Sequence, residues 1–345
     1  MRETFEFRID EDFAGRLFGP DEGVKLKSGI IRLVNIAAND PRLPKIGELQ
    51  RSIHRESDRA FFYGWQIVRK YSKAELNAAS LLHLKITSVF EPAGEECGTK
   101  YDESLACPKC GAGAVQVSDL RLDLRKVPKG KGIARTIADE LIVSQHLAER
   151  MIDAGLTGFE LHPVRHKARY EDDPVDLHRV PSGQEILRRA EAAGAPHPGG
   201  RFYIWVNREE NRALFDQARA EHAALKGREV RRGVKALPVW YQLVVKSADA
   251  KIVPPTRVGI NPFNEDPDGQ CSCPLGDLIG LNLLSEVSIS AANVSGADII
   301  CSRQFIGVRR GLLRPSRVIL ISPKFWRLID SESLRGDSIE VAHLV

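Results

Sequence analysis

The chain has 345 residues, of which 43% are hydrophobic and 28% charged, so it has enough apolar side chains for one large domain or two. The formal net charge of +4 is too small to indicate a nucleic-acid partner by itself. The N-terminal residues lack an apolar run of signal-peptide length, and no stretch approaches the roughly 20 apolar residues of a membrane span, so we expect a cytoplasmic protein that does not cross a membrane.

The first 92 residues have the patterns of mixed α and β structure. Alternating or continuous apolar residues predict strands at 5–9, 30–36, 60–68 and 84–90. The Pro-broken segment 40–45 is expected to be a loop. Ser72 and Glu75 have the spacing of a capping box, in which each side chain accepts a hydrogen bond from the first turn of a helix. This pair predicts a helix that carries Leu76, Ala79, Leu81 and Leu82.

The segment from Cys97 to Gly111 contains three of the six cysteines. Cys107 and Cys110 form a C-x-x-C pair, and Gly111 provides the positive φ that a tight turn requires after the second cysteine. In such a turn both sulfurs reach one ion, and structural zinc takes four Cys or His ligands. The spacing therefore predicts a structural Zn²⁺ site. Cys97, ten residues before Cys107 and also followed by a glycine, is a natural third ligand.

The fourth ligand must come from a distant part of the chain. Cys271 and Cys273, in the sequence QCSCPLG, are the best candidates, and either of them can supply it. Cys301 ends an apolar segment and is expected in the core. A thioredoxin-type redox pair is a weaker alternative, because that motif begins a helix, whereas residues 112–114 look like a turn. Clustered cysteines without an export signal also favour metal over disulfides or free loop thiols.

Residues 115–124 alternate as a strand, and a basic loop at 121–135 follows. Its charged residues are Arg121, Asp123, Arg125, Lys126, Lys129, Lys131 and Arg135. A second basic group comprises Arg228, Arg231, Arg232 and Lys235. Lysine and arginine neutralise phosphates, so a nucleic-acid contact is one interpretation. We favour a solvated loop at 121–135, because it has no aromatic side chain on which a base would stack.

Two strand–helix–strand units are expected farther along the chain. The first has a strand at 140–143, Ser144 as the helix N-cap, a helix at 145–154 ended by Gly155, and a strand at 158–161. The second has a strand at 298–301, Ser302 as the N-cap, a short helix ended by Gly311, and a strand at 318–321. Both serines are therefore interpreted as helix caps and not as nucleophiles.

Between these units the pattern is less regular. We expect a connection at 164–200 with a helix at 184–193, a strand at 201–206, a helix from 207 to about 226 and a strand at 237–245. Residues 254–277 form a loop rich in proline, glycine and aspartate that carries Cys271 and Cys273. Residues 277–287 are apolar and are expected to pack beneath the metal.

Three histidines suggest an alternative, catalytic metal site. His162, His166 and His178 lie near several aspartates, but Pro163 argues against the helix on which an H-x-x-x-H pair would face one ion. The chain has no G-x-S-x-G, phosphate-binding glycine loop, dinucleotide fingerprint or H-E-x-x-H. We identify no catalytic residue and no site for an organic cofactor.

The order of these features resembles the bacterial double-CXXCG motif proteins, known mainly from myxobacteria, and related immunity proteins of polymorphic toxin systems. The resemblance covers roughly the last two-thirds of the chain. Its elements are CPKCG at 107–111, the sequence IVSQHLAERMIDAGLTGFELHPV at 142–164, and a second cysteine site before a final strand–helix–strand. At that second site this chain has Cys271-Ser272-Cys273 in place of C-x-x-C-G. The resemblance implies a non-enzymatic cytoplasmic protein that binds a cognate toxin, with zinc in a structural role.

Together these patterns predict an α+β fold with mixed sheets, short strand–helix–strand units and a zinc-knuckle or ribbon element. We expect an N-terminal α+β region at 1–92, a zinc-knuckle segment at 93–118, and an α+β domain at 119–345 whose 254–277 loop returns to the metal. The favoured function is a zinc-stapled binding protein of the immunity or defence-associated kind. The alternatives are a nucleic-acid-binding zinc-ribbon protein and a metal-dependent enzyme that uses the segment from His162 to His178.

Overall fold

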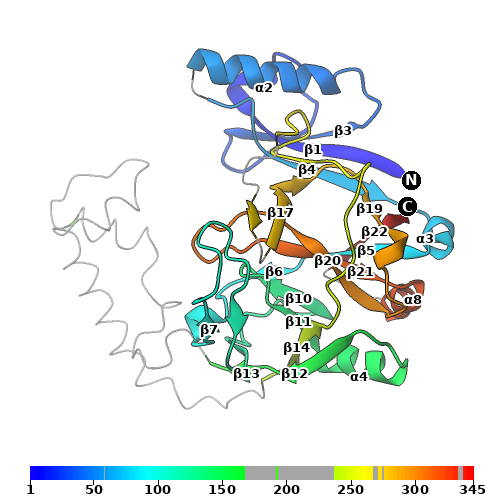
Figure 1. The fold of residues 1–345 in the computed structure, drawn as a ribbon. Coiled ribbons are helices and arrows are strands. Elements are labelled where there is room, and N and C mark those ends of the chain that lie inside the picture. The colour runs from blue at the N-terminus through cyan, green and yellow to red at the C-terminus, as the bar shows by residue number, and fades with distance from the viewer. Residues whose placement is uncertain (58, 168–191, 193–236, 267–270, 274–275, 333–336) are drawn as a thin grey trace.

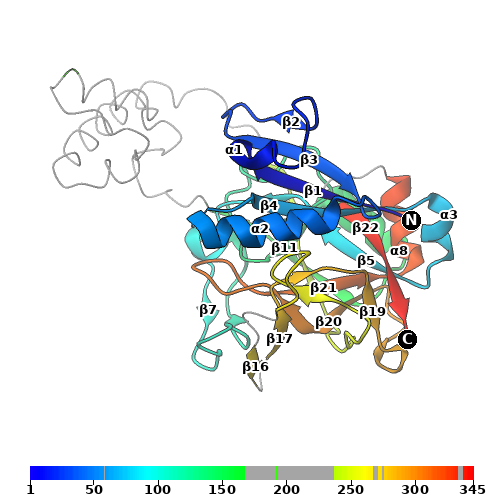
Figure 2. The same ribbon diagram turned by 90° about the horizontal axis from the view of Figure 1, so that it is seen from above.

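The computed structural model describes residues 1–57, 59–167, 192, 237–266, 271–273, 276–332 and 337–345, and the fold is α+β, as expected (Figure 1). Apart from residue 192, the elements predicted between residues 184 and 226 lie outside these ranges, as does the second basic group. In the described residues, no helix has the length and apolarity needed to cross a membrane. The two chain ends lie on the same side of the molecule (Figures 1 and 2).

The N-terminal residues form a four-stranded sheet with its own core. Its strands, in spatial order, are β2 (Val24–Lys25), β3 (Ile31–Ala37), β1 (Arg2–Asp10) and β4 (Phe62–Lys70). Alternation along β1 buries Phe5, Phe7 and Ile9 on one face, as the sequence predicts. This face packs against α2 (Leu43–Ser57) through Ile46 and Ile53, and α1 (Glu11–Ala14) follows β1.

Helix α2 begins inside the segment 40–45, which was expected to be a loop. That prediction was wrong because Pro44 occupies the first turn, where a helix does not need the missing N–H. Gly47, one turn farther on, has Phe263 against it: a Cβ at this glycine would lie 2.7 Å from the Phe263 ring. The loop that precedes Cys271 is therefore anchored in the N-terminal core before it returns to the metal centre.

A seven-stranded sheet occupies the centre of the molecule (Figure 1). Its strands, in spatial order, are β16 (Cys271–Cys273), β17 (Gly276–Gly280), β20 (Ile299–Ile306), β21 (Ser316–Ile321), β5 (Leu81–Ile86), β22 (Asp337–Leu344) and β19 (Val287–Ile289). The boundary expected at residue 92 therefore does not separate two units, because β5 lies between strands from the C-terminal part of the chain.

A five-stranded sheet packs beside the central one. Its strands, in spatial order, are β12 (Phe159–Pro163), β14 (Trp240–Val245), β11 (Leu141–Ser144), β10 (Ile133–Thr136) and β6 (Val89–Phe90). Three two-stranded ladders complete the described strands: β7 (Tyr101–Asp102) with β8 (Val115–Gln116), β9 (Arg121–Leu122) with β13 (Arg165–His166), and β15 (Val258–Gly259) with β18 (Asn282–Leu283). The single strand expected at 115–124 is thus two short strands in different ladders.

The predicted helix caps are confirmed at two positions. Ser72 and Glu75 form the capping box of α3 (Lys73–Ala78), although Leu81 and Leu82 belong to β5 and not to this helix. Ser144 accepts a hydrogen bond from Leu147 N at the start of α4 (Gln145–Asp153). Gly155 has a φ of 60°, as its expected position at the end of that helix requires.

The second strand–helix–strand unit was predicted one strand too early, because its helix follows β21 (Ser316–Ile321) and not β20 (Ile299–Ile306). Ser302 lies inside β20 and is fully buried, and its hydroxyl donates to Gln304 O and accepts from Val318 N. The serine that caps a helix is Ser322, which follows β21 and begins α8 (Pro323–Ser331). The two strand–serine–helix units are therefore β11–α4 and β21–α8, and their helices share one hydrophobic core with β5. Two short 3₁₀ turns, η1 (Glu95–Cys97) and η3 (Ala291–Asn293), occur in connections.

Candidate metal centre

The C-x-x-C segment folds as the tight turn that its sequence predicts. The turn is closed by hydrogen bonds from Gly111 N to Cys107 O, at 2.7 Å, and from Cys107 N to Ala112 O, at 2.8 Å. Gly111 has a φ of 74°, a conformation that costs a residue with a side chain roughly 1–2 kcal/mol. A Cβ at this position would also lie 3.0 Å from the side chain of Arg309. The backbone conformation therefore favours glycine here, and a side chain would in addition require Arg309 to shift.

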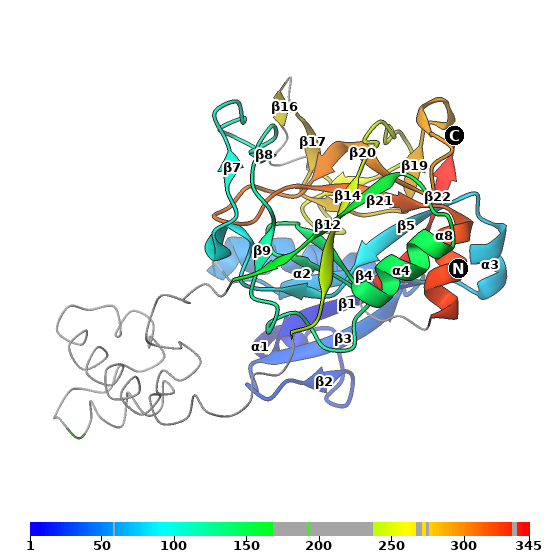
Figure 3. The same cartoon turned by 90° about the horizontal axis from the view of Figure 1, so that it is seen from below.

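The second pair of cysteines lies on a strand and not in a turn. β16 pairs antiparallel with β17, and Cys271 is opposite Leu278 while Cys273 is opposite Gly276. Alternate residues of a strand point to the same face of the sheet. The C-x-C spacing therefore directs both sulfurs toward the C-x-x-C turn. Figures 2 and 3 show that β16 and the turn's neighbouring strand β7 project from the same part of the molecule.

The structure brings together four of the five predicted ligands: Cys107, Cys110, Cys271 and Cys273. Their sulfur atoms all lie within 4.8 Å of one another. The Sγ atoms of Cys107 and Cys271 are 3.7 Å apart, and so are those of Cys110 and Cys273. Zinc–sulfur bonds of about 2.3 Å at tetrahedral angles place two sulfurs roughly 3.8 Å apart. A disulfide needs about 2.05 Å. The arrangement fits one tetrahedral metal ion, and the four thiols are not paired as disulfides.

The thiols of Cys107, Cys110 and Cys271 differ in how readily they lose a proton. Backbone N–H groups of Cys110 and Lys109 donate to the sulfur of Cys107 and lower its pKa to about 6. Burial raises the pKa of Cys110 to about 12 and also raises that of Cys271. A thiolate at Cys107 is therefore formed before one at Cys110 or Cys271, and these two depend on the charge of a bound cation for deprotonation.

Apolar side chains and ion pairs hold the metal-binding turn in place. Ala112, Leu278 and Phe305 pack against the cysteines. Of the segment 277–287, which was expected to lie beneath the metal, only Leu278 belongs to this cluster, whereas Ile279, Leu283 and Val287 pack in a separate core. Glu103, on the loop before the turn, pairs with Arg309 at 2.7 Å and with Arg314 at 2.9 Å. These contacts join the segment around residues 101–116 to the connection between β20 and β21.

The prediction that Cys97 supplies a ligand was wrong. Its side chain is 1% exposed and lies apart from the four gathered sulfurs, in the 3₁₀ turn η1. Burial raises the pKa of its thiol to about 11. Gly98 after it, with a φ of 89°, ends η1 and does not form a metal-binding turn. Both Cys271 and Cys273 take part in the centre, so the expected choice between them does not arise.

The histidine site is not assembled in the described residues. His162 is exposed on β12, and its Nε2 is 3.1 Å from Glu160. His166, on β13, accepts a hydrogen bond from Leu124 N at 3.3 Å. His178 lies outside the described residues, as do the aspartates expected near it. Within the ranges that the structure covers, the four cysteines are the one group of three or more side chains arranged to hold a metal ion.

The basic segment 121–135 is partly neutralised by Asp123 within it and by Asp139 just after it. Arg125 pairs with Asp123 at 2.8 Å, and Arg135 pairs with Asp139 at 2.8 Å. Arg135 also belongs to the short strand β10 and not to a loop. These pairs place a carboxylate beside two of the six cations and so reduce the positive charge available to a phosphate backbone.

Comparison of the chain with models of protein families, with curated protein sequences and with solved structures finds no match.

Proposed function

We propose that this protein is a non-enzymatic binding protein of the cytoplasm, stapled by one structural Zn²⁺ ion at Cys107, Cys110, Cys271 and Cys273. The observation that carries the proposal is the convergence of four sulfurs at tetrahedral spacing from two segments about 160 residues apart. Four cysteine ligands fill the coordination sphere of zinc, and a closed sphere is typical of a structural site because no position remains for substrate. Iron is the other metal that favours four thiolates in this geometry.

The centre would hold two loops that have little regular structure of their own. The turn at 107–111 and the hairpin of β16 and β17 bury few apolar side chains between them. A cross-link that closes a loop of 164 residues restrains the unfolded chain by roughly 5 kcal/mol in the chain-entropy treatment used for disulfides. A metal ion therefore supplies stability that this small cluster lacks.

The partner we propose is a protein toxin, in keeping with the sequence resemblance. Exposed apolar side chains near the metal centre support a protein-binding role, because such groups on a rigid surface favour protein contacts. They are Leu105 (77% exposed), Val115, Val117, Val308 and Leu313. These apolar side chains lie in two segments, around residues 105–117 and 308–313. The ion pairs of Glu103 with Arg309 and Arg314 connect the two segments.

Metal analysis of the purified protein tests the staple. We expect one zinc per chain, and an equal loss of zinc in Cys271→Ser and Cys273→Ser. An iron centre would give visible thiolate-to-iron absorption, which a zinc centre lacks. Wild-type protein with neither metal, or a Cys271→Ser variant with full zinc content, would contradict the proposal.

Co-expression tests the partner. We expect the protein encoded beside this one to arrest growth alone, and co-expression of this chain to restore it through a stable complex. Leu105→Glu combined with Val115→Glu should weaken both the complex and the rescue. Val24→Glu, which changes an equally exposed apolar residue of the N-terminal sheet, should change neither. No complex with the wild type, or equal effects of the two variants, would count against this partner and surface.

A further inference from the structure

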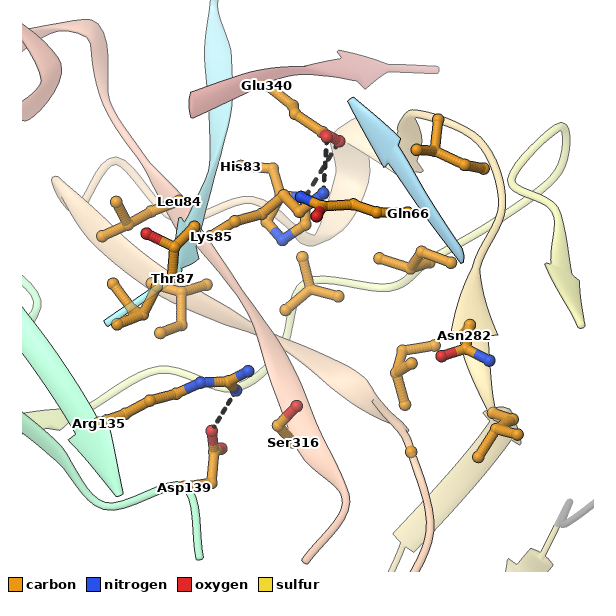
Figure 4. Close-up of a pocket in the computed structure, with 18 of the residues that line it drawn as sticks. Gln66, His83, Leu84, Lys85, Thr87, Arg135, Asp139, Asn282, Ser316 and Glu340 are labelled. Atoms are coloured by element: carbon orange, nitrogen blue, oxygen red, sulfur yellow. Dashed lines mark hydrogen bonds and ion pairs between the residues drawn. The ribbon is translucent and has the colours of Figure 1, made fainter. Parts of the chain in front are cut away.

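A cavity of about 580 Å³ lies between the N-terminal sheet and the central sheet, away from the cysteines (Figure 4). Strand β4 forms one wall, and β5, β21 and β22 form the other. Its lining includes Tyr63, 58% exposed, and the exposed Thr87, so the cavity opens to solvent. The volume falls in the range of small-molecule sites, which favour the junction between two structural layers.

Strand β5 has two faces of different chemistry. Leu82, Leu84 and Ile86 point into the core shared with α4 and α8. His83 and Lys85, on the alternate positions, line the cavity. Opposite His83 in the ladder is Glu340 of β22. A strand at the centre of the molecule thus presents ionisable side chains to an internal space.

The inner end of the cavity holds a buried, charged cluster. Glu340 is 3% exposed, and its carboxylate pairs with Lys85 Nζ at 2.8 Å and with Arg69 Nη1 at 3.1 Å. His83 is 7% exposed, and its Nδ1 lies 3.9 Å from the same carboxylate, too far for a hydrogen bond. Among the residues that the structure describes, this nitrogen has no hydrogen-bond partner.

Arg135 and Asp139 lie across the cavity from this cluster, beside Ser316 (Figure 4). The pair between Arg135 Nη1 and Asp139 Oδ1, at 2.8 Å, orients the guanidinium group. Arg135 Nε is buried and, within the described part of the chain, makes no hydrogen bond. The Arg135 side chain as a whole is 35% exposed and lines the cavity, so its guanidinium group can donate charge-assisted hydrogen bonds to an anion there.

Positive charge exceeds negative charge around the cavity. The lining has four cationic side chains and two carboxylates: Arg69, Lys85, Arg135, Arg317, Asp139 and Glu340. Glu3, which pairs with Arg69 from outside the lining, reduces the excess without removing it. We propose that this cavity binds a small organic molecule bearing a carboxylate or phosphate group, with the guanidinium group of Arg135 donating to the anion and His83 contacting the remainder of the ligand. The bound molecule would bridge β10 of the five-stranded sheet and β5 of the central sheet.

NMR of the full chain with ¹⁵N-labelled arginine tests this site through the Nε–Hε signals. The probes are inorganic phosphate and succinate, titrated at constant ionic strength. We expect one of them to shift the Arg135 signal saturably, and the one that does so distinguishes a phosphate from a carboxylate ligand. Calorimetric affinity should fall at least tenfold in Arg135→Gln. It should be unchanged in Arg327→Gln, which removes the same charge from the exposed face of α8.

A second variant keeps the test decisive if Arg135→Gln unfolds. Ser316→Phe leaves every charge in place and fills the cavity from β21, and it should abolish binding. No saturable shift with either probe, or binding that survives both Arg135→Gln and Ser316→Phe, would mean that the cavity holds only water and would overturn the proposal.

Discussion

The sulfur of Cys107 lies 3.7 Å from that of Cys271, although 164 residues separate them in the chain. Neither cysteine is positioned by its sequence neighbours alone. Cys107 is held by a glycine-closed turn, and Cys271 by a hairpin at the edge of the central sheet. The cysteine cluster therefore forms only when the local turn and the edge of the central sheet are both in place. Substitutions around it can separate the contribution of the turn from that of the sheet.

Cys107→Ala and Cys97→Ala should differ in their effect on bound metal. Cys107→Ala removes a ligand, so we expect zinc content to fall to near zero and the free energy of unfolding to decrease by roughly 5 kcal/mol. Cys97→Ala should cost a cavity term of about 1 kcal/mol and leave zinc content at the wild-type value. Metal analysis with chemical denaturation checks both. Zinc loss in Cys97→Ala would restore that cysteine as a ligand.

Gly111→Ala should lower the affinity for metal, because the turn after Cys110 needs a positive φ and has little space beside Arg309. We expect a loss of roughly 1–2 kcal/mol of stability and a measurable fall in zinc affinity by chelator competition. Gly29→Ala is a matched control, since its φ is 72° and its Cβ would meet nothing within 4 Å. Gly29→Ala should cost similar backbone strain without changing zinc affinity. Equal affinities in the two variants would argue against the turn's role.

Acid should destabilise the protein through His83. Its burial lowers the pKa to about 4 from an ordinary value of 6.5, an effect that Glu340 opposes and that Lys85, Arg69 and Arg135 reinforce. Between these two values the unfolded chain binds a proton that the folded chain does not, so stability falls as pH drops from 6.5 toward 4. The contribution is about 3 kcal/mol at most, and it is absent above pH 7.

Denaturation curves from pH 4 to 8 measure this effect. His83→Gln should flatten the stability profile between pH 4 and 6.5. His54→Gln, at an exposed position of α2, is the matched control. Glu340, whose pKa is lowered by neighbouring cations despite its burial, adds a loss in the same direction at the acid end. An identical slope in wild type and His83→Gln would show that other groups cause the acid sensitivity.

Ser144 and Ser302, both expected to be helix caps, should respond differently to glycine. Ser144 caps α4, so Ser144→Ala should cost about 1 kcal/mol and Ser144→Gly only a few tenths. Ser302 is buried in β20 and accepts from Val318 N. Ser302→Ala should cost about 1–3 kcal/mol, and Ser302→Gly should cost more because glycine weakens a strand. Thermal unfolding of the four variants shows whether alanine or glycine costs more stability at each serine. The same ranking at Ser144 and Ser302 would contradict these assignments.

The features that the sequence predicted correctly depend on residues close together in the chain. The alternation of Phe5, Phe7 and Ile9 identified β1, and the capping box at Ser72 identified α3. The C-x-x-C-G pattern identified the tight turn and two of the four cysteines that gather in the structure. Capping, strand alternation and the positive φ of glycine act over a few residues, so their signals are readable locally.

The errors arose where tertiary packing chose between patterns that look alike. Ser302 was interpreted as a helix cap, whereas β20 continues through that position as an irregular stretch between two segments paired with β21, and Ser302 forms a bridge with Ala250. A cysteine followed by glycine was read as a ligand at Cys97, whereas Gly98 ends a 3₁₀ turn. A proline was read as part of a loop at Pro44, although the first turn of a helix accepts it.

The sequence by itself determined that this protein is an α+β chain with a cysteine turn able to hold a metal and with serine-capped helices. The tertiary structure alone decided that Cys271 and Cys273 both join that turn while Cys97 does not, and that His83 and Glu340 meet across two strands. The physical reason is that these contacts depend on the order of strands in the central sheet, which sequence spacing does not encode.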